Sequence, residues 1–270
     1  MLQRIITGAV LAVLVIMLIV FSATFVFPVI MTLLAAVGTY EMLSCIGLKK
    51  NMLVSIPALI SSVLGVLSAY FLGYGACLAV IMCYLILQLA ICVFFDEKVK
   101  IQDAFCAFSS TLYVMLCLAA FTAVRTIEDT GLYLFLLVFI GAWITDTFAY
   151  FTGVFFGKHK LIPKISPKKT IEGSVGGILF CVVAFAVYGL ILRNIVGLTV
   201  NFPVLLLLGL VMSVISQIGD LIASAIKRTY GIKDYGSLFP GHGGVLDRFD
   251  SIMILSPCVL LAAENLVVFA

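Results

Sequence analysis

Charged side chains and glycines gather in one stretch near the end of the chain, residues 224–250. In a chain that is 64% hydrophobic and 11% charged, this stretch holds four cations and three carboxylates among its glycines. Glycine lets a backbone approach a ligand closely, cations hold phosphates, and carboxylates hold a divalent cation. These are the groups that bind a polyphosphate with its magnesium ion: Lys227, Arg228, Lys233, Arg248, Asp234, Asp247 and Asp250.

Polar residues also continue from this stretch into the apolar segments beside it. At helical spacing, Asp220 shares one face with Ser224, Lys227 and Arg228. A carboxylate at that depth in a membrane helix marks a functional interior, or alternatively a salt bridge that only holds helices together. Asp247 and Asp250 open the following helix, and carboxylates from two adjacent helices suit magnesium.

A second basic loop lies at residues 157–173. Lys168 and Lys169 can bind a triphosphate or a lipid phosphate, and the alternative is a polybasic loop resting on anionic headgroups. The specific reading is favoured for these two lysines, and both readings stay open for Lys158, Lys160 and Lys164. In the helix before the loop, Asp146 is another intramembrane carboxylate, with a buried ion pair as its alternative role.

Three further polar residues carry weaker signals. His242 is expected to contact a phosphate or a ribose, or to donate a structural hydrogen bond, because a phosphate oxygen needs no general base at neutral pH. His159 is expected on a solvated loop. Glu41 is either functional or paired near Lys49 at its helix end, with the second reading slightly favoured.

Composition sets the fold class. A mean hydropathy of +1.28 over the chain predicts an all-α polytopic membrane protein. The net charge of +3 is spread through short loops, which argues against a nucleic-acid partner. Residues 1–130 are expected to form the N-terminal helices, about five, and 131–270 a catalytic region with about four helices and two loops. Apolar runs predict nine spans near residues 5–21, 24–48, 53–72, 75–95, 104–124, 131–156, 173–193, 203–227 and 249–269.

The basic residues also predict an orientation. With nine spans and a cytoplasmic N-terminus, all but two of the 16 lysines and arginines lie inside, and only Arg125 and Arg193 lie outside. This arrangement places both polar loops in the cytoplasm, where nucleotides are found. We therefore expect a polar cavity that faces the cytoplasm from the inner membrane.

The stretch resembles a known family. The signature of the phosphatidate cytidylyltransferases, also called CDP-diacylglycerol synthases, is matched in order and spacing at Ser224, Lys227, Arg228, Lys233, Asp234, Gly236, Phe239, Pro240, His242, Gly243, Gly244, Asp247, Arg248 and Asp250. Ser166–Thr170 with Glu172 and Gly173 resemble a second segment of that family, although Ile171 stands where many members carry tryptophan. The resemblance covers about 125 residues from Trp143 onward.

The resemblance implies transfer of the cytidylyl group of CTP to phosphatidate within the bilayer, giving CDP-diacylglycerol and pyrophosphate. It also implies a homodimer. Asp220 and Asp247 are the implied Mg²⁺ ligands, with a second cation left open. The implied catalytic set adds Lys227, Arg228, Lys168 and Lys169. The implied substrate contacts are Asp146, Ser224, Lys233, Asp234, His242, Gly243, Gly244, Arg248 and Asp250.

Three other functions compete with this one. A CTP-dependent lipid kinase would release CDP in place of pyrophosphate. A transporter would use Asp146 and Asp220 as a midplane ion site, but the chain lacks inverted repeats and its polar residues gather at one membrane face. A purely structural scaffold has no use for so many matched charges in one loop.

Overall fold

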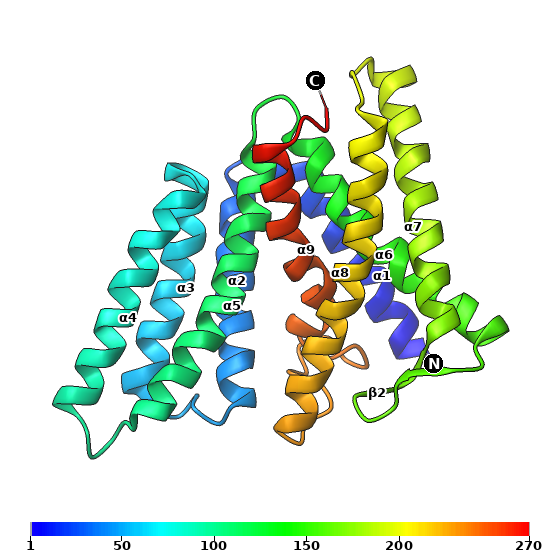
Figure 1. The fold of residues 1–270 in the computed structure, drawn as a ribbon. Helices are drawn as coiled ribbons and strands as arrows, with labels where there is room; N and C mark the ends of the chain where they lie inside the picture. The colour runs from blue at the N-terminus through cyan, green and yellow to red at the C-terminus, as the bar shows by residue number, and fades with distance from the viewer. Residues whose placement is uncertain (1, 270) are drawn as a thin grey trace. The chain divides into compact units, whose positions relative to one another are not determined.

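The computed structural model describes residues 2–269, and side chains from Thr7 to Phe269. Within these residues the chain forms nine α-helices (Figure 1). Their bounds are Leu2–Val20 (α1), Val26–Cys45 (α2), Met52–Leu72 (α3), Cys77–Phe94 (α4), Ile101–Thr126 (α5), Gly131–Phe156 (α6), Ile171–Ile191 (α7), Phe202–Thr229 (α8) and Leu246–Asn265 (α9). Short 3₁₀ turns precede α2 and α4, and a π-helical turn at Leu192–Val196 follows α7.

The predicted all-α membrane fold is confirmed. Each predicted span coincides with one helix to within a few residues, and α6 matches residues 131–156 at both ends. Seven of the described helical segments are long and apolar enough to cross a bilayer. Among the residues with described side chains, the apolar segment Thr7–Ala23, which contains most of α1, is shorter than these, and α9 carries several charged residues.

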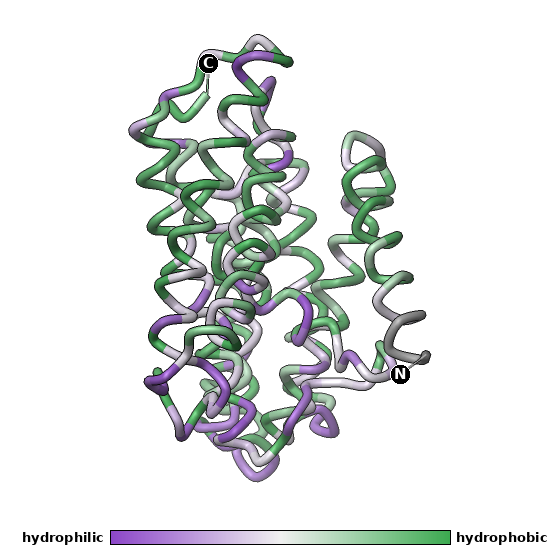
Figure 2. Tube along the Cα trace, turned by 90° about the vertical axis from the view of Figure 1, so that its right-hand side faces the viewer, coloured by the Kyte–Doolittle hydropathy of each residue, from purple (hydrophilic) through white to green (hydrophobic). Residues whose placement is uncertain are grey.

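Hydropathy follows the helices. In Figure 2 the apolar residues run along the helices, while the hydrophilic residues gather in the connections between them. Large apolar side chains such as Leu179 on α7 are exposed, at 61% for this residue. Exposed apolar faces on several helices are what a lipid environment requires, because lipid tails solvate them.

One element was not predicted from the sequence. Lys160–Ile162 (β1) and Ser166–Thr170 (β2) form an antiparallel hairpin inside the basic loop, with Ile162 opposite Ser166 and Lys160 opposite Thr170. The strands are too short and too polar for a period-2 hydrophobic pattern to reveal them. The hairpin ends where Thr170 caps α7, its Oγ1 accepting a 3.1 Å hydrogen bond from the Gly173 N–H.

The chain divides into two compact units. The first contains the residues up to Ala123 together with Thr229–Phe249, and the second contains Val124–Arg228 and the residues from Asp250 onward. In the first unit, α2 packs on α3 and α3 on α4 (Figure 1). The assignment of 1–130 and 131–270 as N-terminal and catalytic regions stays a prediction, and residues 229–249 cluster with the N-terminal helices.

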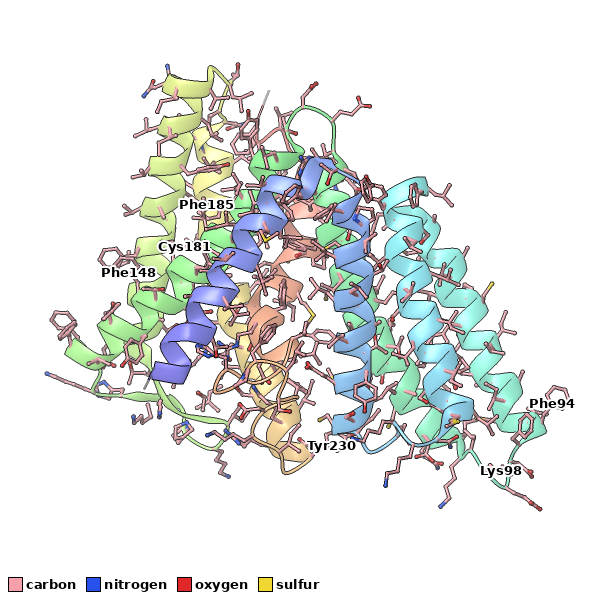
Figure 3. All side chains as sticks on the ribbon, turned by 180° about the vertical axis from the view of Figure 1, so that it is seen from behind. Phe94, Lys98, Phe148, Cys181, Phe185 and Tyr230 are labelled. Carbon is pink, nitrogen blue, oxygen red and sulfur yellow. The ribbon has the colours of Figure 1, made fainter. Side chains whose placement is uncertain are left out.

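The second unit is organised by close contact between α6 and α7. Gly176 and Gly177 allow this approach, because a Cβ on Gly177 would lie 2.9 Å from the Thr145 carbonyl oxygen. The Phe148 and Phe180 rings stack with centroids 4.0 Å apart, and Cys181 and Phe185 are fully buried on α7 (Figure 3). Phe185 lies against Gly209, which joins α7 to α8.

We expect Gly177→Val to lower the free energy of unfolding by about 1–3 kcal/mol, because its side chain would force α7 away from the backbone of α6. Thermal unfolding in detergent measures the effect. Val183→Ile, which adds one carbon at an exposed position of α7, is the matched control and should leave the melting temperature unchanged. Equal melting temperatures for both variants would show that the close approach does not stabilise this unit.

Candidate active site

A cavity of about 550 Å³, lined by both charged and apolar residues, lies in the second unit. Residues from α6, the hairpin, α7 and α8 form its walls. They are Asp146, Ala149, Tyr150, Gly153, Val154, Gly157, Lys160, Leu161, Lys168, Lys169, Thr170, Gly173, Ser174, Gln217 and Asp220. The cavity therefore brings together the carboxylates at 146 and 220 with the two lysines that the sequence analysis favoured for phosphate binding.

An ion pair crosses the cavity. Lys169 Nζ lies 2.6 Å from Asp220 Oδ2, and both side chains are partly buried. The same ammonium group donates a 3.5 Å hydrogen bond to the carbonyl oxygen of Gln217, nearly one turn earlier on α8. Lys169 thus balances negative charge on Asp220.

Two more carboxylates belong to the same electrostatic group. Asp146, on α6, accepts a 3.3 Å hydrogen bond from the hydroxyl of Ser251 on α9. Asp250 is close enough to interact electrostatically with Asp146, Asp220 and Lys227. Three helices of one unit therefore direct negative charge toward a common region, and lysines compensate part of it.

Tight packing fixes the hairpin that carries Lys168 and Lys169. A Cβ on Gly153 would lie 2.9 Å from Thr170 Oγ1, and one on Gly173 would lie 3.1 Å from the Gly153 Cα. Gly157 is as crowded, because its Cβ would meet the backbone of Gly153 and the Thr170 side chain. These glycines let β2 and the start of α7 lie directly on α6, which fixes the position of Lys169 beside Thr170.

Glu172 anchors the other end of the hairpin. Its carboxylate accepts hydrogen bonds from the backbone N–H groups of Lys158, at 3.1 Å, and His159, at 3.2 Å. The His159 ring nitrogen Nδ1 lies 2.6 Å from Glu172 Oε1. His159 is exposed as predicted. Its contact with Glu172 also joins the residue before β1 to the first turn of α7.

The glycine-rich loop, residues 229–249, belongs to the first unit. Asp247 is buried, and its Oδ2 accepts hydrogen bonds from the N–H groups of Tyr235, at 2.7 Å, and Gly244, at 2.9 Å. Gly243, with φ of 83°, lies against the Asp247 carboxylate, where a Cβ would clash. Asp247 therefore organises the loop, and its predicted role as a metal ligand stays a prediction.

His242 lies within the same loop. Its backbone N–H donates a 2.8 Å hydrogen bond to the Phe239 carbonyl oxygen, and Phe239 and Gly243 form an isolated bridge. Its ring lies near Gly8 of α1, and its buried Nδ1 has no hydrogen-bond partner among the described residues. Nδ1 of this imidazole thus has no acceptor for a proton among the described residues.

The other predicted residues fall into two groups. Ser224, Lys227, Arg228 and Asp250 share the second unit with the cavity but lie outside its described lining. Lys233, Asp234 and Arg248 are exposed on the first unit, with Gly243, Gly244 and Asp247 in the same loop. Their predicted roles stay predictions.

Sequence reasoning missed several residues of the cavity wall. Gln217 is buried and donates through Nε2 to the carbonyl oxygens of Ser174 and Ser213, both at 3.3 Å. Thr170 positions the lysines through its contacts with the glycines. A threonine directly before an apolar helical run is a signal for an N-cap, but no pattern tells which buried amide faces a cavity.

Comparison with known proteins agrees with these features. The model of the Cytidylyltransferase family matches residues 2–265. A phosphatidate cytidylyltransferase of Bacillus subtilis is 34% identical over 262 residues, 94% of each chain. One of Staphylococcus epidermidis is 38% identical over 232 residues, covering 83% of this chain and 85% of the relative. One of Staphylococcus aureus is 36% identical over 256 residues, covering 92% and 94%.

We expect Glu172→Gln to loosen the hairpin, because the amide nitrogen cannot accept the backbone hydrogen bonds that the carboxylate accepts. Limited tryptic digestion should then cut faster at the lysines of residues 158–164. The control is His159→Ala, which removes only an exposed partner and should change the cleavage rate much less. Cleavage of Glu172→Gln at the wild-type rate would rule out the anchor.

Proposed function

The chain belongs to the Cytidylyltransferase family, and we propose that it transfers the cytidylyl group of CTP to phosphatidate. The products are CDP-diacylglycerol, which stays in the bilayer, and pyrophosphate. The family resemblance read from the signature is thereby confirmed for the chain as a whole, including the N-terminal helices. The observation that carries the proposal is the cavity where Lys169 pairs with Asp220 beside Asp146 and Lys168.

The reaction poses an electrostatic problem. A triphosphate with about four negative charges must meet a lipid phosphate that carries nearly two. Their mutual repulsion has to be reduced before an oxygen of the lipid phosphate can attack the α-phosphorus of CTP in line with the leaving pyrophosphate. The nucleophile is already anionic, so catalysis consists of positioning and charge stabilisation.

The lysines of the hairpin meet this requirement. Lys160, Lys168 and Lys169 line the cavity, and the anchored hairpin fixes the lysines of β2 beside Thr170. In the proposed mechanism, the Lys169 ammonium group turns from Asp220 toward a phosphate oxygen when CTP enters. Lys168 holds a second phosphate oxygen. Each cation reduces the repulsion between the two substrates.

The cavity suits a magnesium ion. Among the described residues, no group of three or more His, Cys, Asp or Glu residues forms a metal cluster. Asp146 and Asp220 nevertheless line one cavity, and magnesium commonly takes one or two carboxylates and completes its shell with phosphate oxygens and water. Bound there, the ion would neutralise phosphate charge. Asp220 is one of the predicted ligands, and Asp146 adds a second carboxylate that lines the same cavity.

The positive-inside rule supports an inner-membrane protein whose N-terminus and both polar loops face the cytoplasm. Since the lipid substrate and product remain in the bilayer, this orientation gives the site access to cytoplasmic CTP. The homodimer implied by the resemblance also belongs to this proposal, and cross-linking in membranes tests it.

Incubation of the purified protein with labelled CTP, phosphatidate and magnesium tests the proposed reaction. We expect label from the cytidine to enter the lipid phase as CDP-diacylglycerol, with one pyrophosphate released for each lipid formed. Release of CDP together with a newly phosphorylated lipid would instead identify a CTP-dependent lipid kinase. Nucleotide-independent solute uptake by proteoliposomes, with no lipid product, would favour a transporter.

Asp220→Asn should abolish magnesium-dependent turnover without unfolding the protein, because the amide keeps the size of the side chain but removes the charge. Asp247→Asn tests the second predicted ligand in the same assay. Product formation is measured against magnesium concentration, with thermal unfolding as the folding control. Wild-type rates in Asp220→Asn would remove this residue from the proposed magnesium site.

His242→Gln should reduce the turnover number less than Asp220→Asn does, because the proposed attack requires no general base. Glutamine keeps a hydrogen-bonding side chain in the loop. The turnover number is compared between pH 6 and 9, and the shape of the profile should stay as in the wild type. A larger loss than in Asp220→Asn, with a basic limb missing from the profile, would assign proton transfer to His242.

A further inference from the structure

Glu41 is a buried carboxylate inside an apolar helix. It lies near the end of α2 and is only 5% exposed. A charge without partners in such a place is strongly destabilising, so the side chain must be paired or hydrogen-bonded. The sequence slightly favours pairing of Glu41 near Lys49, but Lys49 lies over the Tyr40 ring, with its Nζ 5.8 Å from the centroid.

The partners of Glu41 lie about two hundred residues away in the sequence. Its Oε1 accepts a 3.0 Å hydrogen bond from the Val245 N–H, and its Oε2 accepts a 2.9 Å hydrogen bond from the Leu246 N–H. Leu246 is the first residue of α9, where free N–H groups and the helix dipole favour an anion. Glu41 therefore caps α9 from another helix.

Two glycines of the signature pack directly on the same carboxylate. A Cβ on Gly236 or on Gly244 would clash with the Glu41 side chain, and the two positions lie against each other as well. Neither residue has a positive φ, so the reason for glycine here is the close approach of the carboxylate. The packing of Glu41 thus accounts for glycine at two positions of the loop without any contact to a substrate.

Asp247 holds the loop from inside through the N–H groups of Tyr235 and Gly244. Glu41 holds it from α2 through the next two N–H groups of the chain, those of Val245 and Leu246. Two buried carboxylates thereby bind consecutive amides at the point where the loop becomes α9. Removal of either leaves buried N–H donors without acceptors.

We propose that Glu41 is a positioning residue that fixes the glycine-rich loop for nucleotide binding. The inference rests on the proposed function and on the substrate contacts that the family resemblance implies for Lys233, Asp234, His242 and Arg248 of this loop. Glu41 itself lies on α2, among the N-terminal helices, where the sequence carries no signature residue. Glu41 touches no substrate in this proposal, and it acts only through the conformation of the loop.

The kinetic constants of Glu41→Gln test this inference. Glutamine has the same size, but its NH₂ group faces one of the two backbone N–H donors and cannot accept its hydrogen bond. One charge-assisted hydrogen bond is therefore lost. We expect the KM for CTP to rise about 10- to 100-fold, the factor expected for one such bond. The KM for phosphatidate should change much less. Thr39→Val is the matched control, since Thr39 is buried on the same helix and its hydroxyl has no hydrogen-bond partner in the described part of the chain.

A purely structural role predicts a different result. It would lower the fraction of folded enzyme and therefore the apparent turnover number, with the KM for CTP unchanged, and that outcome overturns the proposal. If Glu41→Gln does not fold, Gly236→Ala places a methyl group against the same carboxylate from the loop side, at a position with no predicted substrate contact. The same rise in the KM for CTP is then expected, and an unchanged KM rejects the inference.

Limited proteolysis separates this inference from the proposed function. Trypsin should cut Glu41→Gln faster at Lys233 than it cuts Thr39→Val, whether or not the protein turns over CTP. If the wild-type protein does not transfer a cytidylyl group, the proposed function is refuted. The cleavage rates at Lys233 then still test the loop anchor. Equal cleavage rates in an active protein would refute the anchor and leave the function intact.

Discussion

A carboxylate inside an apolar helical bundle must be matched by a partner, and this requirement governs both polar regions of the protein. In the second unit the partner is a side chain, because Lys169 lies 2.6 Å from Asp220 and both residues line one cavity. In the first unit the partners are backbone N–H groups, which Glu41 and Asp247 take from the glycine-rich loop. A lysine can be exchanged for another cation, whereas a hydrogen-bonded backbone cannot leave its acceptor without a change of conformation. The first arrangement suits ligand binding, and the second suits the support of a loop.

The glycines also divide into two groups, those that pack the basic hairpin and those that accommodate a carboxylate. Gly153, Gly157 and Gly173 bring the basic hairpin onto α6, while Gly236 and Gly244 make room for the Glu41 carboxylate. Gly241 and Gly243 have positive φ values, which other residues adopt only with strain. Glycine in this chain therefore serves to bring the backbone close to other groups, and only in part to allow turns.

The helices could be predicted from the sequence because membrane spans are set by the length of apolar runs, a local property. The cavity charges were also predictable, since Asp146, Asp220, Lys168 and Lys169 stand out against apolar neighbours. The β hairpin was not, because its strands are short and its register depends on contacts with α6 and α7. The partners of Glu41 were equally hidden: they are backbone amides far along the chain, and a backbone amide has no signature in the sequence.

Equilibrium binding of labelled CTP in the absence of phosphatidate tests most directly whether the cavity charges hold the nucleotide. The measurement compares the wild type with Lys169→Met, each with and without magnesium. We expect tight binding that depends on magnesium in the wild type and a large loss of affinity in Lys169→Met. Equal affinity for CTP in both proteins, unaffected by magnesium, would contradict the assignment of this cavity as the nucleotide site.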